Sequence, residues 1–177
     1  AGLGYGHGTH VAGLIALSAP LAKIVPYRVL DPNGEGNAWV LAEALYRAID
    51  PDGNPATDDG AHVINLSLGT QLRTRVLASI AKLFSCEPPD EADPLLNFSD
   101  SGYAADKARC AESSGPVIVA AAGNDGSGSV NEYPAAESVY GLISVGASND
   151  TRHLATFSNS GSWVQIAAPG EGITSAI

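Results

Sequence analysis

The segment HVINLSL, residues 62–68, is a short run rich in β-branched and other apolar side chains, and it ends at Gly69. Three further segments have the same character: KIVPYRVL at 23–30, PVIVAAA at 116–122 and GLISVGA at 141–147. Short runs of this kind, bounded by Gly, Pro, Asn or Asp, are typical of strands buried on both faces in parallel sheets. The four segments therefore predict the strands of a parallel sheet.

Two amphipathic segments, 37–49 and 74–84, lie among these runs. Their apolar side chains follow helical spacing: Val40, Leu41, Ala44, Leu45 and Ala48 in the first, and Val76, Leu77, Ile80, Ala81 and Phe84 in the second. Strands that alternate with helices of about 10 to 15 residues predict an α/β fold, a three-layer doubly wound, mostly parallel sheet with right-handed crossovers. In such sheets, sites form outside the carboxyl ends of the strands.

The composition fits one globular domain of 177 residues, 45% of which are hydrophobic. Nineteen Asp and Glu against nine Lys and Arg give a net charge of −10. This balance argues against nucleic acid and anionic membrane surfaces as partners, because both need clustered cations. No apolar run approaches the roughly 20 residues of a membrane span.

Residues 86–114 interrupt the α/β pattern with a stretch rich in Pro, Asp, Ser and Ala, and we expect a surface insertion there. Cys86 and Cys110 lie within it. A disulfide between them would stabilise the fold by roughly 3 kcal/mol and would indicate an oxidising compartment, as for a secreted protein. The alternative is a reactive thiol, although neither a CxxC pattern nor a neighbouring His supports it.

The segment GHGTHVAG, residues 6–13, carries two histidines at the expected start of a helix. A His in the first helical turn, flanked by Gly, can project its ring into a cleft. Three interpretations are open from the residues alone: a structural histidine, a catalytic one, or a zinc-binding pair His7 and His10. The zinc interpretation lacks an accompanying HExxH or Cys set.

Eight sequence blocks together resemble those of the subtilisin-like serine proteases, the subtilases (peptidase family S8). The first is HGTHVAG at 7–13, and the others follow in the order of that family. They are Val29-Leu30 with Gly34-Glu35-Gly36, VINLSLG at 63–69, VAAAGND at 119–125, YPA at 133–135, SVGA at 144–147, FSNSG at 157–161 and APG at 168–170. The resemblance covers the chain apart from the insertion.

The resemblance implies roles for three polar residues. His7 matches the catalytic imidazole, which takes the proton of the nucleophile and later donates it to the leaving amine. His10 matches a buried structural histidine. Asn124 matches the amide donor of the oxyanion hole, whose loss typically costs about 2.7–4 kcal/mol of transition-state stabilisation.

The resemblance also implies a cleft for an extended polypeptide substrate. One side is formed by Ser67, Leu68 and Gly69, and the other by Gly34, Glu35 and Gly36. Main-chain hydrogen bonds there supply affinity, and side-chain pockets supply selectivity. Ala121, Ala122 and Gly123 match the wall of the primary specificity pocket, where small residues leave room for a large apolar side chain. Glu35 on the rim offers a weaker argument for basic substrate side chains.

Two family elements have no counterpart in these 177 residues. Subtilases carry their triad in the order Asp, His, Ser. The Asp-bearing strand would precede His7, and a Gly-Thr-Ser-Met-Ala block would follow Gly170; Ser175 lacks the flanking Gly-Thr and a following helix. We therefore expect residues 1–177 to be part of a catalytic domain, truncated at both ends and inactive alone. Flanking segments or a second chain would have to complete the sheet.

We expect neither a cofactor nor a metal. The stretch 18–27 is short and lacks Asp and Asn, so it does not supply the calcium ligands that some subtilases carry after this helix, although calcium elsewhere in a longer protein stays open. Asp52, Asp58 and Asp59 lie in a polar loop that lacks a full DxDxDG pattern, which favours a solvated loop over a cation site.

The sequence thus predicts part of a secreted serine-type endopeptidase, the part that contains the catalytic base His7 and the oxyanion donor Asn124. The alternative is a non-catalytic subtilase-like protein whose groove binds peptides or acts as a scaffold.

Overall fold

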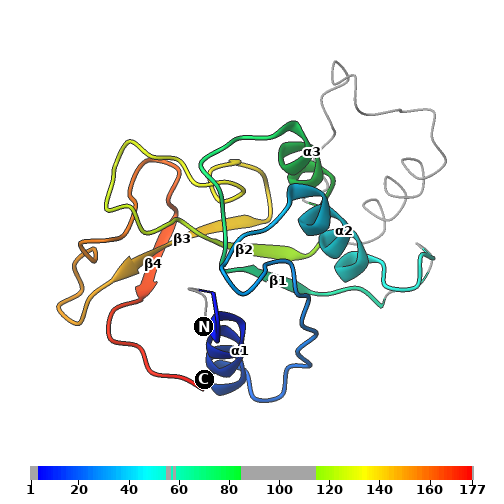
Figure 1. Cartoon of the computed structure of the whole chain (residues 1–177), viewed down its shortest axis with the longest axis horizontal. Coiled ribbons are helices and arrows are strands. Elements are labelled where there is room, and N and C mark those ends of the chain that lie inside the picture. Colours follow the sequence, from blue (N-terminus) through cyan, green and yellow to red (C-terminus); the bar gives the residue numbers. More distant parts are fainter. Residues whose placement is uncertain (1–3, 55–56, 58, 85–114, 177) are drawn as a thin grey trace.

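The computed structural model describes residues 4–54, 57, 59–84 and 115–176 (Figure 1). In chain order, the elements of this part are α1 (His7–Ser18), α2 (Ala38–Ile49), β1 (Val63–Leu66), α3 (Arg75–Phe84), β2 (Val117–Ala121), β3 (Leu142–Ser148) and β4 (Ile166–Pro169). The insertion 86–114, with Cys86 and Cys110, lies outside the described residues, so the insertion and its disulfide stay predictions. No helix in the described ranges is both long and apolar enough to cross a membrane.

The four strands form one parallel sheet in the order β1-β2-β3-β4. Val63 pairs with Val117, Ile118 with Leu142, and Val145 with Ile166. Helices α2 and α3 lie together on one side of the sheet and α1 lies on the other, which gives three layers (Figure 1). Because the strands are parallel, the segments that follow β1 and β2 emerge at the same edge of the sheet.

Helix α2 shows how the core forms. Asn37 caps it, since its side chain accepts a hydrogen bond from Trp39 N at 2.8 Å. Its buried side chains recur at helical spacing, with Leu41 and Leu45 among them, and they pack with buried residues of the sheet such as Leu66 and Ile118. Burial of each such leucine contributes roughly 1.5–3 kcal/mol.

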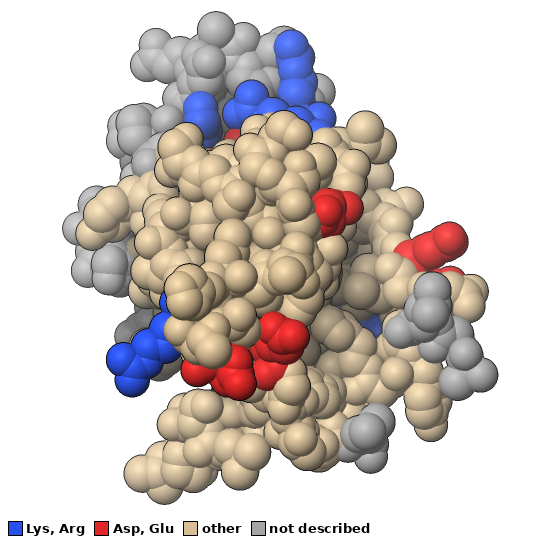
Figure 2. All heavy atoms as spheres, turned by 90° about the vertical axis from the view of Figure 1, so that its left-hand side faces the viewer, with Lys and Arg blue, Asp and Glu red and all other residues tan. Residues whose placement is uncertain are grey.

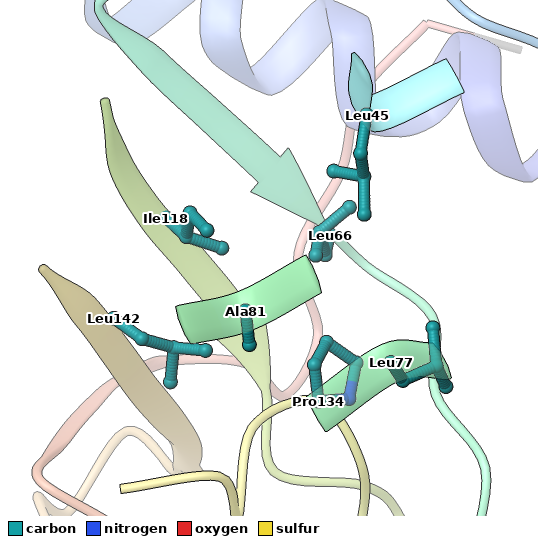
Figure 3. Close-up of a pocket in the computed structure, with 7 residues that line it drawn as sticks. All are labelled: Leu45, Leu66, Leu77, Ala81, Ile118, Pro134 and Leu142. Atoms are coloured by element: carbon teal, nitrogen blue, oxygen red, sulfur yellow. The ribbon is translucent and has the colours of Figure 1, made fainter. Parts of the chain in front are cut away.

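The core between α2, α3 and the sheet contains a cavity of about 10 Å³. Figure 3 shows the apolar side chains that surround it: Leu45, Leu66, Leu77, Ala81, Ile118, Pro134 and Leu142. A space this small and apolar admits at most one water and offers it no polar partner. The cavity is a packing defect of the core and not a ligand site.

The expectation that the strands are buried on both faces is wrong for β1. Ile64 and Leu66 are buried, whereas Val63 and Asn65, which alternate with them along the strand, are exposed, Val63 to 60%. The reason is that α2 and α3 cover one face only. On the other side α1 buries none of its own residues, so in the described ranges the second face stays partly open.

The expected strand at 23–30 is also wrong. In the described ranges its backbone pairing is limited to a single bridge between Leu30 and Gly36, and Val25 is 56% exposed. Pro26 has no N–H for a ladder, which disfavours pairing in a sheet. Conversely, the sequence did not predict β4. Its segment IAAP at 166–169 is short, and in the structure all four of its residues are exposed.

Candidate active site

The candidate site lies where the carboxyl ends of β1 and β2 meet. Ser67, Leu68 and Gly69 follow β1, and Ala122, Gly123 and Asn124 follow β2. The backbone of Ala122 still belongs to the sheet, since its N–H donates to Val145 O at 2.9 Å. The sequence thus brings two of its predicted site segments to the same edge of the sheet.

His7 begins α1 and points at this edge. Gly6 before it adopts φ 82°, a left-handed conformation that favours glycine. The exposed imidazole has Nε2 at 2.8 Å from Ser67 O. A carbonyl oxygen only accepts, so Nε2 carries the hydrogen, and the lone pair of a neutral ring is on Nδ1. In this orientation Nε2 is therefore a donor to the Ser67 carbonyl and not a base.

His10 lies one turn further along α1 and is half-buried, less than the buried histidine that the resemblance implies. Its Nε2 lies 3.4 Å from Ile173 O, and its carbonyl accepts from Ser175 Oγ at 2.8 Å. These contacts tie α1 to residues 173–176. They support a structural role for both His10 and Ser175.

Asn124 lies in a loop whose geometry depends on Gly123. Gly123 adopts φ 93°, and a Cβ there would lie 2.6 Å from Asn159 Nδ2. The side chain of Asn124 is exposed, and among the described residues nothing hydrogen-bonds to it. Its amide is therefore available to a substrate.

Asn159 holds this loop from beneath, and sequence reasoning noted it only as a member of the FSNSG block. It is fully buried, and its Oδ1 accepts from Asp125 N at 3.0 Å and from Ser127 N at 3.2 Å. Its Nδ2 donates to Asp125 Oδ2 at 3.0 Å, and its backbone N–H donates to Gly123 O at 3.1 Å. The Asn159 side chain thus holds the backbone of the loop at two positions, Asp125 and Ser127.

A pocket of about 420 Å³ opens beside Asn124. Its lining combines the segment after β1, the segment after β2 and one further side chain: Ser67, Leu68, Gly69, Thr70, Gln71, Ala121, Gly123, Asn124, Asp125 and Glu132. Ala122 does not line it, since this residue is 1% exposed and faces the core.

Gly34, Glu35 and Gly36 do not line this pocket either. They form a separate turn, in which Asp31 Oδ1 accepts from Glu35 N at 2.9 Å and from Asn33 N at 2.8 Å. The hydrogen bond from Glu35 is the main reason that the pKa of the Asp31 carboxyl lies below its ordinary value. Gly34 adopts φ 86° and packs against Gly4. The substrate-binding role of this segment stays a prediction.

Glu132 is a second residue that sequence reasoning missed. Burial raises the pKa of its carboxyl above the ordinary 4.5, and the neighbouring charge of Asp125 adds to the effect. Neither carboxylate belongs to an ion pair among the described residues. No local signal singles out Glu132, because its neighbours come from two other segments. Figure 2 shows that carboxylates are the main charged groups in the central part of one face of the molecule, with basic side chains mostly toward its edges.

Another acidic group lies away from this pocket. Asp50, Asp52 and Asp59 are the one set of three or more potential metal ligands in the described ranges whose atoms lie within 4.8 Å of one another, and neither His7 nor His10 belongs to it. Asp58 lies outside the described residues. One oxygen of Asp50 is buried without a hydrogen-bond partner. Asp52 Oδ1 accepts from Asn54 N at 2.8 Å and from Thr57 Oγ1 at 3.0 Å. At one oxygen each, the three carboxylates supply fewer than the six to eight oxygens that calcium takes, so the solvated loop stays the prediction.

Comparison with known proteins places these features in a family. The sequence profile of the subtilase family matches residues 3–177. The chain is 37% identical to the thermophilic serine proteinase of Bacillus sp. strain AK1, over 97% of its own length and 36% of that protein. It is 33% identical to subtilisin Savinase of Lederbergia lenta, over 97% of its length and 53% of that protein.

The fold agrees with the sequence. The structure of a cold adapted subtilisin-like serine proteinase superimposes with a TM-score of 0.63 at 27% identity, over 96% of this chain and 50% of that one. A lanthipeptide protease superimposes with a TM-score of 0.64 at 25% identity, over 94% of this chain and 43% of that one. The chain spans about half or less of the length of these relatives. The parallel sheet between helices is the α/β fold of subtilisin-like proteinases, and the chain belongs to the subtilase family.

Proposed function

We propose that the protein containing this chain is a serine-type endopeptidase in which His7 is the base and Asn124 donates to the oxyanion. The observation that carries the proposal is the convergence of both residues on Ser67. His7 binds the Ser67 carbonyl, and Asn124 lines the same pocket as Ser67. A base and an amide donor on two sides of one peptide-binding segment fit acyl transfer.

The chemistry assigns each proton. A serine hydroxyl attacks the scissile carbonyl carbon and passes its proton to His7, and the carbonyl oxygen becomes an oxyanion that accepts from the Asn124 amide. His7 then protonates the leaving amine, and water completes the hydrolysis. For this role the His7 ring has to turn from its hydrogen bond with Ser67 O, so that a nitrogen with a lone pair faces the hydroxyl.

We infer that the serine and the carboxylate that orients His7 come from parts of the protein beyond these 177 residues, and that the chain alone does not hydrolyse peptides. The share of each relative that the chain spans, 36% and 53% for two of them, supports this inference. Residues 1–177 are then part of one catalytic domain, with 86–114 as an insertion.

The substrate is a polypeptide in extended conformation. β1 is at the edge of the described sheet, so the segment Ser67 to Gly69 that continues it is placed to pair with an added strand. Gly34 to Gly36 would form the opposite side.

Secretion and a disulfide between Cys86 and Cys110 complete the proposal, and a relative described as the minor extracellular protease Epr of Bacillus subtilis supports secretion.

The test uses the protein encoded by the full reading frame that contains this chain. We expect it to react with a fluorophosphonate serine probe and to hydrolyse peptides. His7→Ala should abolish both, whereas His153→Ala, which changes an exposed histidine bonded to Thr151, should preserve them.

Asn124→Ala should lower kcat by about 10²–10³ with little change in KM. A folded full-length protein that binds peptides but neither reacts with the probe nor hydrolyses them would favour the non-catalytic scaffold instead.

A further inference from the structure

The Glu132 side chain crosses the pocket beside Asn124 between two glycines. A Cβ at Gly69 would lie 2.6 Å from both Cγ and Oε1 of Glu132, and a Cβ at Gly123 would lie 3.3 Å from its Oε2. Gly69 has no positive φ, so a larger residue there would meet the flexible Glu132 side chain and not an unfavourable backbone conformation. The Glu132 side chain thus lies against both segments that wall the pocket, the one after β1 and the one after β2.

The carboxylate has no partner that neutralises it. Among the described residues, neither a hydrogen bond nor an ion pair involves the Glu132 side chain. The basic residue Arg73, whose guanidinium lies over the ring of the adjacent Tyr133, pairs instead with Glu137, with its Nη2 at 2.8 Å from Glu137 Oε2. Glu132 is also half-buried, so water solvates it incompletely.

Asp125 adds a second negative charge to the pocket. Its Oδ1 accepts from Gln71 Nε2 at 3.1 Å, and its Oδ2 accepts from Asn159 Nδ2 at 3.0 Å. Both donors are neutral amides, which hold the carboxylate in place without cancelling its charge. The pocket therefore presents two carboxylates and no cation of its own in the described part of the chain.

We propose that this pocket selects a lysine or arginine side chain of the peptide substrate, with Glu132 as the residue that determines the specificity. The inference rests on the proposed endopeptidase function and names the substrate class for that site. The aliphatic stem of the substrate side chain lies along Leu68 and Ala121, and its cationic head pairs with Glu132.

An apolar side chain is rejected by the same carboxylate. In the pocket it would displace water from Glu132 and leave the charge both desolvated and unpaired. From the sequence alone we expected a large apolar side chain here, because Ala121 and Gly123 are small. The small residues instead make room for the Glu132 carboxylate and its counterion.

The experiment measures kcat/KM of the full-length protein on fluorogenic peptides that differ only at the residue whose side chain enters the pocket. Lysine, arginine, norleucine, phenylalanine and glutamate are compared. We expect lysine and arginine to exceed norleucine by about tenfold or more, since norleucine has a similar stem without the charge. Glutamate should be the poorest substrate. This comparison needs no variant.

Glu132→Gln should lower the ratio of lysine to norleucine by about tenfold. Glu43→Gln, which removes an exposed carboxylate on α2, is the matched control and should leave the ratio unchanged. The fluorophosphonate probe is applied in parallel to every preparation, because labelling reports the nucleophile independently of the side-chain preference.

The two hypotheses fail in different ways. A labelled protein that hydrolyses norleucine or phenylalanine peptides as well as lysine peptides refutes the specificity and leaves the endopeptidase function intact. A folded protein without labelling or hydrolysis refutes both.

Discussion

Replacement of Asn159 by alanine is the most direct test of how the loop that carries Asn124 is held. The side chain of Asn159 is fully buried and makes three hydrogen bonds, two from the backbone N–H groups of Asp125 and Ser127 and one to the Asp125 carboxylate. Asn159→Ala removes all three and retains the two backbone bonds, from Asn159 N to Gly123 O and from Ser158 Oγ to Asn159 O.

The expected loss follows from these bonds. Each bond from a backbone N–H contributes about 1 kcal/mol, and the bond to a carboxylate about 1.5–3 kcal/mol. Because Asp125 is exposed, water replaces part of the last contribution, and we take its lower value. The variant should therefore lose about 3.5 kcal/mol of its free energy of unfolding.

The assay is urea unfolding of the full-length protein, with a serine-protease inhibitor present to prevent self-digestion. Asn131→Ala is the matched control, because Asn131 is exposed and its side chain makes one long contact of 3.4 Å to Tyr133 Oη. It should change stability by less than about 0.5 kcal/mol.

A loss below about 1 kcal/mol for Asn159→Ala would refute the argument, since one bond would then account for it. An equal loss in the Asn131 control would refute it as well. If the loop positions the oxyanion donor, Asn159→Ala should also slow labelling by the fluorophosphonate probe in preparations that remain folded.

Three further predictions concern charge and backbone strain. Because the folded pKa of Glu132 is raised, the folded state holds that proton more strongly than the unfolded state. The free energy of unfolding should therefore fall as pH rises from 4.5 through the folded pKa of Glu132. Above this pH range Glu132→Gln should be more stable than the unsubstituted protein, and below it the two should be equally stable. Urea unfolding at a series of pH values measures this difference. Arg73→Ala leaves the Glu137 carboxylate, whose side chain is 4% exposed, without its cation, and should cost about 1.5–3 kcal/mol in the same assay. The exposed pair of Arg47 with Glu43 is its control, since Arg47→Ala should cost less than about 0.5 kcal/mol, and equal losses would contradict the role of burial. Gly123→Ala places a side chain at φ 93° and in a clash with Asn159. Its control is Gly53→Ala, where φ is 72° and nothing lies within 4 Å of the new Cβ, so Gly123→Ala should lower the free energy of unfolding by more. A smaller or equal loss at Gly123 would argue against the clash.

Much of the sheet could be predicted because buried parallel strands leave a local trace. The runs that became β1, β2 and β3 are short, apolar and bounded by turn residues, and the structure has strands within one residue or a few of the expected bounds. Helices α2 and α3 were predicted for a similar reason, since each places its apolar side chains on one face.

Pairing was not predictable for the other runs. KIVPYRVL has the composition of a strand, yet in the described structure no neighbouring backbone pairs with it beyond one bridge. IAAP has weak local character, yet it pairs with β3 from Val145 to Ser148. A strand requires a partner distant in the sequence, and local composition does not specify that partner.

The amino-acid sequence by itself determined the α/β class, the family, and the residues His7 and Asn124 as candidates, because each of these leaves a contiguous pattern. Only the tertiary structure decided what surrounds them. It placed Glu132 between Gly69 and Gly123, placed Asn159 under the Asn124 loop, and turned Nε2 of His7 toward Ser67 O. The physical reason is that the charge, solvation and hydrogen bonding of a side chain depend on its neighbours in space, and here those neighbours come from segments far apart along the chain.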